Sequence, residues 1–131
     1  MQPSALAEAK DWLARSAEDL AAAERLLQTP PPLLATAAYH AQEAAEKALK
    51  AFLAGRNIAF RLTHNLEELV SAAEEVDASF GHFATTARTL TPYAVRFRYP
   101  GGPVAPTPVE AEEAFYLAPK LVQFVRGRLE L

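Results

Sequence analysis

The stretch ATAAYHAQEAAEKALKAFL, residues 35–53, decides the fold. At about 100° per residue its small and apolar side chains share one arc of a helix: Ala41, Ala44, Ala45, Ala48, Leu49, Ala51 and Phe52. The opposite arc carries polar and charged residues: Tyr39, His40, Glu43, Glu46, Lys47 and Lys50. This division predicts an amphipathic helix, and its many alanines allow a neighbouring helix to approach closely.

The polar arc is where we expect any functional site. Its residues recur at helical spacings of three, four and seven, so several of them can act together. The structural alternative is a solvated face. On such a face the pairs Glu43–Lys47 and Glu46–Lys50 would each contribute only ~0.3–0.5 kcal/mol.

Periodicity and capping residues predict helices on both sides of this stretch. Apolar residues repeat every three or four positions up to about residue 28, with Ser4 as N-cap, and prolines 30–32 end that helix. Gly55 is suited to cap the central helix at its C-terminus. The short proline connection makes the first two helices antiparallel neighbours.

Three further helix starts follow. Thr63 or Asn65 can cap the first of them, and Asn65 with Glu68 also fits a capping box. Asp77 is suited to cap a segment that ends before Thr91-Pro92. Thr107-Pro108-Val109-Glu110 is the strongest helix start in the chain, and Pro119 is expected to kink the helix that follows it. Residues 93–99 alternate like a strand, but no second strand exists to pair with them, so we expect a helical or irregular segment.

These elements predict an all-α protein, an up-and-down antiparallel bundle of four to five helices formed by one domain, residues 1–131. Half of the residues are hydrophobic and 22% are charged, as in soluble globular proteins. The chain has no cysteine and shows no signal peptide or membrane span, which predicts a cytoplasmic protein. A net charge of −3 argues against strong nonspecific binding of nucleic acids.

Motifs for metal or nucleophile chemistry are missing from the sequence. The three histidines are far apart, and no Glu-x-x-His pair occurs. Gly101-Gly102 lacks the Lys-Ser/Thr of a phosphate-binding loop. We therefore predict no metal site, no required cofactor and no catalytic residue.

Four blocks of the sequence, taken in order, resemble the HEPN domain. They are Trp12-Leu13 with Asp19-Leu20, residues 39–50 (YHAQEAAEKALK), Thr63-His64-Asn65-Leu66, and residues 93–100 (YAVRFRYP). The resemblance covers nearly the whole chain. It implies a helical bundle that dimerises around a polar cleft, and often a minimal nucleotidyltransferase as partner. Some members bind nucleotides, and many others are metal-independent ribonuclease toxins.

The ribonuclease branch of the family carries an arginine and, after four to six residues, a histidine near the last helices. Here no histidine follows His82, so that catalytic pair cannot be assigned and we expect no metal-independent ribonuclease activity. Large aromatic residues beyond the needs of a small core, Trp12, Tyr39 and Phe97, predict a homodimer.

The resemblance and the residue chemistry together predict a non-catalytic dimer that binds a nucleotide, a nucleotidyltransferase partner of a toxin–antitoxin type pair, or both. Arginines and lysines would bind phosphate, and tyrosines would stack on a base. Two alternatives stay open, namely a divergent metal-independent ribonuclease that uses His40 or His64 as general base, and a pure protein-interaction module. The candidate cleft residues are Tyr39, His40, Glu43, Lys47, Lys50, His64, Tyr93, Arg96, Arg98 and Tyr99.

Overall fold

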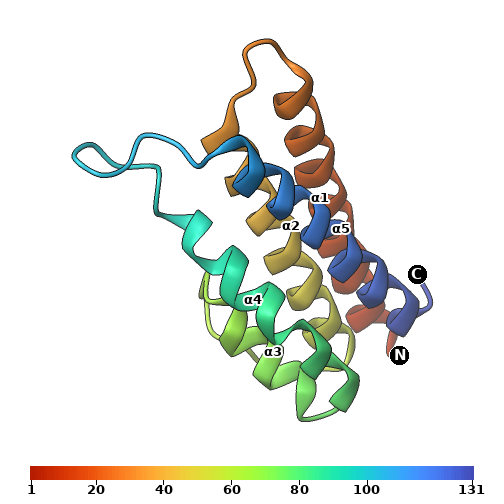
Figure 1. The fold of residues 1–131 in the computed structure, drawn as a ribbon. Helices are drawn as coiled ribbons and strands as arrows, with labels where there is room; N and C mark the ends of the chain where they lie inside the picture. The colour runs from red at the N-terminus through yellow and green to blue at the C-terminus, as the bar shows by residue number, and fades with distance from the viewer.

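In the computed structural model, which describes residues 1–131, α2 is the central helix of an all-α bundle (Figure 1). It packs against α1, α5 and α3. The two chain termini lie at the same end of the bundle (Figure 1). The α-helices are α1 (Pro3–Gln28), α2 (Leu34–Gly55), α3 (Leu66–Glu74), α4 (Ala84–Leu90) and α5 (Pro108–Leu129), and short 3₁₀ helices span Ala78–Phe83 and Thr91–Ala94.

The predicted all-α bundle is confirmed, but α2 is not an amphipathic surface helix. Of its 22 residues, 16 are buried, including Glu43, Glu46 and Lys50 on the polar arc. The alanine arc is fully inaccessible, because α1 and α5 pack against it at close range. Both arcs of α2 are therefore covered by the protein, and the solvated-face alternative is wrong for these three residues.

Two predicted helix ends are wrong. Helix α1 begins at Pro3, and its N-cap is Gln2 without a side-chain hydrogen bond, so Ser4 lies inside the first turn. Gly55 is the last residue of α2 and not a left-handed cap; the residue with positive φ is Asn57, at 57°. A Cβ on Gly55 would lie 2.9 Å from Leu129 Cδ2, so glycine serves close helix packing there.

The other start signals are confirmed in whole or in part. Thr107 and Glu110 form the complete capping box of α5, which runs through Pro119 to Leu129. Asn65 caps α3 by accepting from two backbone N–H groups of its first turn, yet Glu68 binds Arg61 and does not close a box. Asp77 caps the 3₁₀ helix through the Ser79 N–H.

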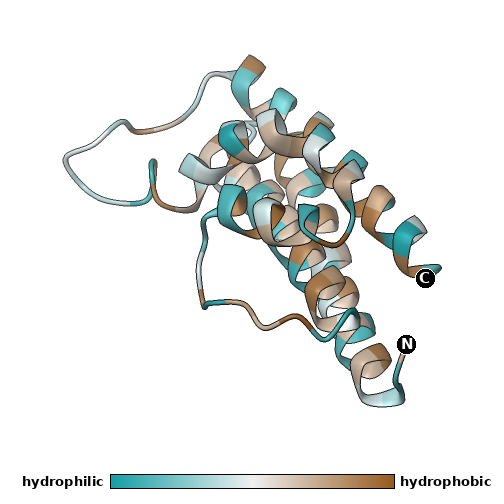
Figure 2. Cartoon of the chain, turned by 90° about the horizontal axis from the view of Figure 1, so that it is seen from below, coloured by the Kyte–Doolittle hydropathy of each residue, from teal (hydrophilic) through white to brown (hydrophobic).

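Residues 91–99 form a 3₁₀ turn and irregular backbone, as predicted, and no strand. Phe97 stacks on the buried ring of Tyr93 with a centroid separation of 6.0 Å, which ties this segment to the core. The segment that follows projects away from the bundle before α5 begins (Figure 2). None of the helices combines the length and hydropathy that a membrane crossing requires.

Candidate functional site

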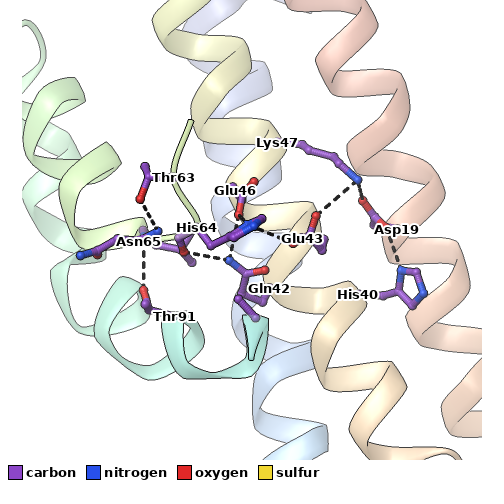
Figure 3. Close-up of polar contacts among 12 residues, drawn as sticks. Asp19, His40, Gln42, Glu43, Glu46, Lys47, Thr63, His64, Asn65 and Thr91 are labelled. Carbon is purple, nitrogen blue, oxygen red and sulfur yellow. Dashed lines mark hydrogen bonds and ion pairs between the residues drawn. The ribbon is translucent and has the colours of Figure 1, made fainter. Parts of the chain in front are cut away.

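A chain of polar contacts joins α1 to the polar arc of α2 (Figure 3). Asp19, on α1, has one carboxylate oxygen 2.8 Å from His40 Nδ1 and the other 2.6 Å from Lys47 Nζ. Lys47 also lies 3.7 Å from Glu43, one turn earlier on α2. Asp19 is buried, so its carboxylate holds these two side chains of α2 in fixed positions.

A second polar group surrounds Glu46 in the middle of α2. Lys50 Nζ donates to Glu46 Oε2 at 2.8 Å, and both side chains are almost fully buried. Glu46 Oε1 is 2.8 Å from His64 Nδ1 and accepts from Gln42 Nε2 at 3.2 Å. The Lys50 ammonium also lies 5.6 Å from the centre of the Trp12 ring. Residues from α1, α2 and the segment before α3 thus meet around one ion pair.

Two pKa shifts follow from this crowding. Burial raises the pKa of the Glu43 carboxyl, and the nearby negative charge of Glu46 raises it further. Burial alone would lower the pKa of Lys47, but its hydrogen bond and charge contact with Asp19 outweigh this and raise it. A carboxyl with a raised pKa beside a lysine held in its charged form is typical of functional sites.

An aromatic cavity lies next to the His40 end of this network. The Arg98 guanidinium sits 4.0 Å over the ring of Tyr39, and the Tyr39 and His40 rings meet edge to face. The cavity has a volume of about 310 Å³ and is lined by Ala35, Thr36, Tyr39, His40, Phe97 and Arg98. An arginine beside two aromatic rings can bind an anionic group and a planar one together.

The structure divides the predicted cleft residues into three sets. Tyr39, His40 and Arg98 line the cavity; a second set lies in the carboxylate network, namely Glu43, Lys47, Lys50 and His64. Tyr93 is buried in the core, Arg96 stacks on Phe97 outside the cavity, and Tyr99 is exposed on the loop side. The ten residues therefore do not form one cleft.

Sequence reasoning missed two residues of the network. Asp19 is buried on the same face of α1 as Ser16 and Ala23. An acidic residue on the buried face of a helix needs a partner, and this position could have marked Asp19 as a candidate. Gln42 is fully buried and donates to Glu46 and to the His64 carbonyl oxygen. No local pattern marked Gln42, because His64 lies 22 positions away along the chain.

Comparisons with known proteins agree with the architecture. The sequence profile of the HEPN domain matches residues 9–128. A crystal structure of TT1696 from Thermus thermophilus is 33% identical, with a TM-score of 0.79. The match covers 92% of this chain and 97% of that one. No curated protein is significantly similar to the chain.

Proposed function

The chain belongs to the HEPN family, and we propose that it is a non-catalytic member that binds a nucleotide in the cavity between Tyr39 and Arg98. In this proposal Arg98 binds the phosphate and the aromatic rings hold the base. The residues of the carboxylate network position the cavity wall through His40. The proposal narrows the candidate cleft to the residues that line one cavity.

The observation that carries the proposal is that the Arg98 guanidinium is held in place but has no acidic partner. Its guanidinium has no carboxylate partner, and its hydrogen bond goes to the Ala94 carbonyl oxygen at 3.3 Å. Stacking on Tyr39 holds the group in place without using its donors. An arginine in a fixed position with free donors is suited to bidentate binding of phosphate oxygens.

His40 and the cavity walls complete the site. His40 Nδ1 is occupied by Asp19, so Nε2 is the ring nitrogen left for a ligand on the cavity side. Tyr39 and Phe97 supply aromatic surface of the cavity wall against which a purine or pyrimidine can pack. Asp19 thereby fixes the ring orientation of a ligand-facing histidine.

The space is large enough for a nucleotide. The cavity of about 310 Å³ is at the lower end of the ~300–1,000 Å³ range of small-molecule sites. A second cavity of about 330 Å³ along residues 97–104 shares Phe97 and Arg98 with it. A base can therefore occupy the first cavity while phosphates extend past Arg98 into the second.

A direct test is calorimetric titration of the purified protein with a panel of mono-, di- and triphosphate nucleotides. Arg98→Ala should weaken binding ~10- to 100-fold, because a hydrogen bond to a charged group contributes ~1.5–3 kcal/mol. The melting temperature should change little, since Arg98 is exposed. Arg88→Ala is the matched control, because Arg88 is an exposed arginine on α4 that contacts Thr85 outside the cavity. Unchanged binding in Arg98→Ala, or no binding of any nucleotide, would refute the proposal and favour the interaction module.

We also propose that the protein is a homodimer. Of the three aromatic residues that first suggested it, Trp12 and Phe97 pack against the core of one chain and Tyr39 lines the cavity. Support comes instead from α5, where Val109 and Tyr116 are exposed and lie seven residues apart on one face. Val104, in the preceding loop, is also exposed. A nucleotidyltransferase partner, in a pair of the toxin–antitoxin type, stays a prediction from family membership.

A further inference from the structure

Glu43, Glu46 and His64 form a cluster of metal-ligand atoms outside the nucleotide cavity. The two glutamates occupy successive turns of α2, and His64 approaches them from the segment before α3 (Figure 3). One ligand atom from each residue lies within 4.8 Å of the other two. His64 is more than half exposed while both carboxylates are buried, so the cluster is reachable from solvent on the histidine side.

A separate observation points to a missing ligand. Glu43 Oε1 is buried and has no hydrogen-bond partner in the protein, and the whole Glu43 side chain is only 9% exposed. Lysines approach the other oxygens: Lys47 lies 3.7 Å from Glu43 Oε2, and Lys50 donates to Glu46 Oε2. The two Oε1 atoms face His64 Nδ1, at 3.7 Å for Glu43 and 2.8 Å for Glu46, and Glu46 Oε1 also accepts from Gln42 Nε2. An unpaired carboxylate oxygen in this position costs free energy unless something binds it.

The charges around the cluster also favour binding of a cation. Three carboxylates, those of Asp19, Glu43 and Glu46, face two ammonium groups, those of Lys47 and Lys50. With the histidines neutral, the network carries one excess negative charge. A divalent cation with one monoanionic ligand, such as hydroxide, would bring the network to neutrality.

We propose that Glu43, Glu46 and His64 bind a divalent transition-metal ion of the Zn²⁺ class. Two carboxylate oxygens and one imidazole nitrogen suit this class, and three protein ligands leave a fourth position open. Ligands at ~2.0–2.1 Å from a tetrahedral ion lie ~3.3 Å apart. The present Nδ1–Oε1 separations of 2.8 Å and 3.7 Å bracket that distance, and all three ligand atoms lie within 4.8 Å of one another.

Binding has a defined proton balance. The neutral His64 ring changes tautomer through solvent: Nδ1 loses the proton that now lies between it and Glu46, Nε2 gains one, and the ion takes the place of the Nδ1 proton with no net proton released by the histidine. The lysines keep their contacts with the outer carboxylate oxygens and orient the ligating groups. This assignment reverses the expectation from sequence, which found no metal motif because His64 is distant from the glutamates along the chain.

The test is titration of chelator-treated full-length protein with Zn²⁺, followed by calorimetry, and with Co²⁺, followed by visible absorption. We expect one Zn²⁺ per chain and a four-coordinate Co²⁺ spectrum. Both His64→Ala and Glu43→Gln should weaken Zn²⁺ binding at least ~10-fold and abolish that spectrum. His82→Ala is the matched control, because His82 is exposed and outside the cluster.

Folding and independence are checked in the same variants. Glu43→Gln keeps the side-chain shape, so its far-ultraviolet circular dichroism should match the parent. Arg98→Ala should bind Zn²⁺ normally, because Arg98 lines a different site. Zn²⁺ affinity that is unchanged in both ligand variants, loss of affinity in His82→Ala, or absence of a one-to-one complex would each overturn the proposal.

Discussion

Replacing Lys50 by methionine should destabilise the protein strongly, although the apolar side chain is similar in length. The Lys50 ammonium donates to Glu46 Oε2 at 2.8 Å, and the two side chains are 6% and 4% exposed. Lys50→Met removes the cation and leaves a buried carboxylate oxygen without its partner. The expected effect comes from the carboxylate that remains and not from lost packing.

Removing one member of a buried ion pair costs about 3–5 kcal/mol of unfolding free energy. We expect the lower end, about 3 kcal/mol, because Glu46 Oε1 keeps its contacts with His64 and Gln42. The double variant Glu46→Leu, Lys50→Met should recover part of this loss, since it removes both charges together but also removes the acceptor that Gln42 and His64 share.

Urea denaturation of the three proteins tests this prediction. With an m-value of ~1–3 kcal/mol/M, Lys50→Met should lower the midpoint by ~1–3 M at unchanged slope. Lys10→Met is the control, because Lys10 is exposed on α1, away from the ion pairs and from the exposed face of α5. Its midpoint should stay near that of the parent. A loss below ~1 kcal/mol in Lys50→Met, or a double variant as unstable as the single one, would refute the reasoning.

Three further outcomes are expected. The hydrogen bond from Arg128 lowers the pKa of Asp77 from its ordinary 3.8. The parent should therefore be more stable than Arg128→Gln at neutral pH, and the difference in unfolding free energy should shrink below pH 3.8. A difference that grows in acid would contradict this prediction. Sedimentation should give a dimer, and a mass near the chain's 14.2 kDa at tens of micromolar protein would not fit. The isolated protein should not cleave RNA in the presence of a chelator, whereas cleavage that His40→Ala or His64→Ala abolishes would favour the ribonuclease alternative.

Local signals were sufficient to predict the helices. The alanine arc of α2 and the capping box at Thr107 are properties of a few neighbouring residues, and the bundle follows from helices joined by short connections. The wrong end at Gly55 has a tertiary cause, because the side chain of Leu129 occupies the space that a Cβ would need. Sequence periodicity contains no information about that contact.

The site was predictable only in its residue types. The arc of α2 pointed to His40 and Glu43, but Asp19 contacts His40 from another helix. Arg98 reaches Tyr39 because Phe97 stacks on Tyr93 and fixes the segment, and this packing is not visible in a local pattern. Long-range contacts therefore decided which candidates share a cavity and which share a carboxylate.

The alanine composition of α2 explains why the buried polar atoms without hydrogen-bond partners lie on this helix. Alanine allows α1 and α5 to approach the helix, so long charged side chains on the other arc are covered as well and need partners. Most of them find one, at i+4 or on α1. The buried side-chain atoms that find none are Gln42 Oε1 and Glu43 Oε1, on adjacent residues. A ligand that satisfies a buried polar atom gains more than one that replaces an existing contact, so this turn of α2 is where binding would stabilise the fold most.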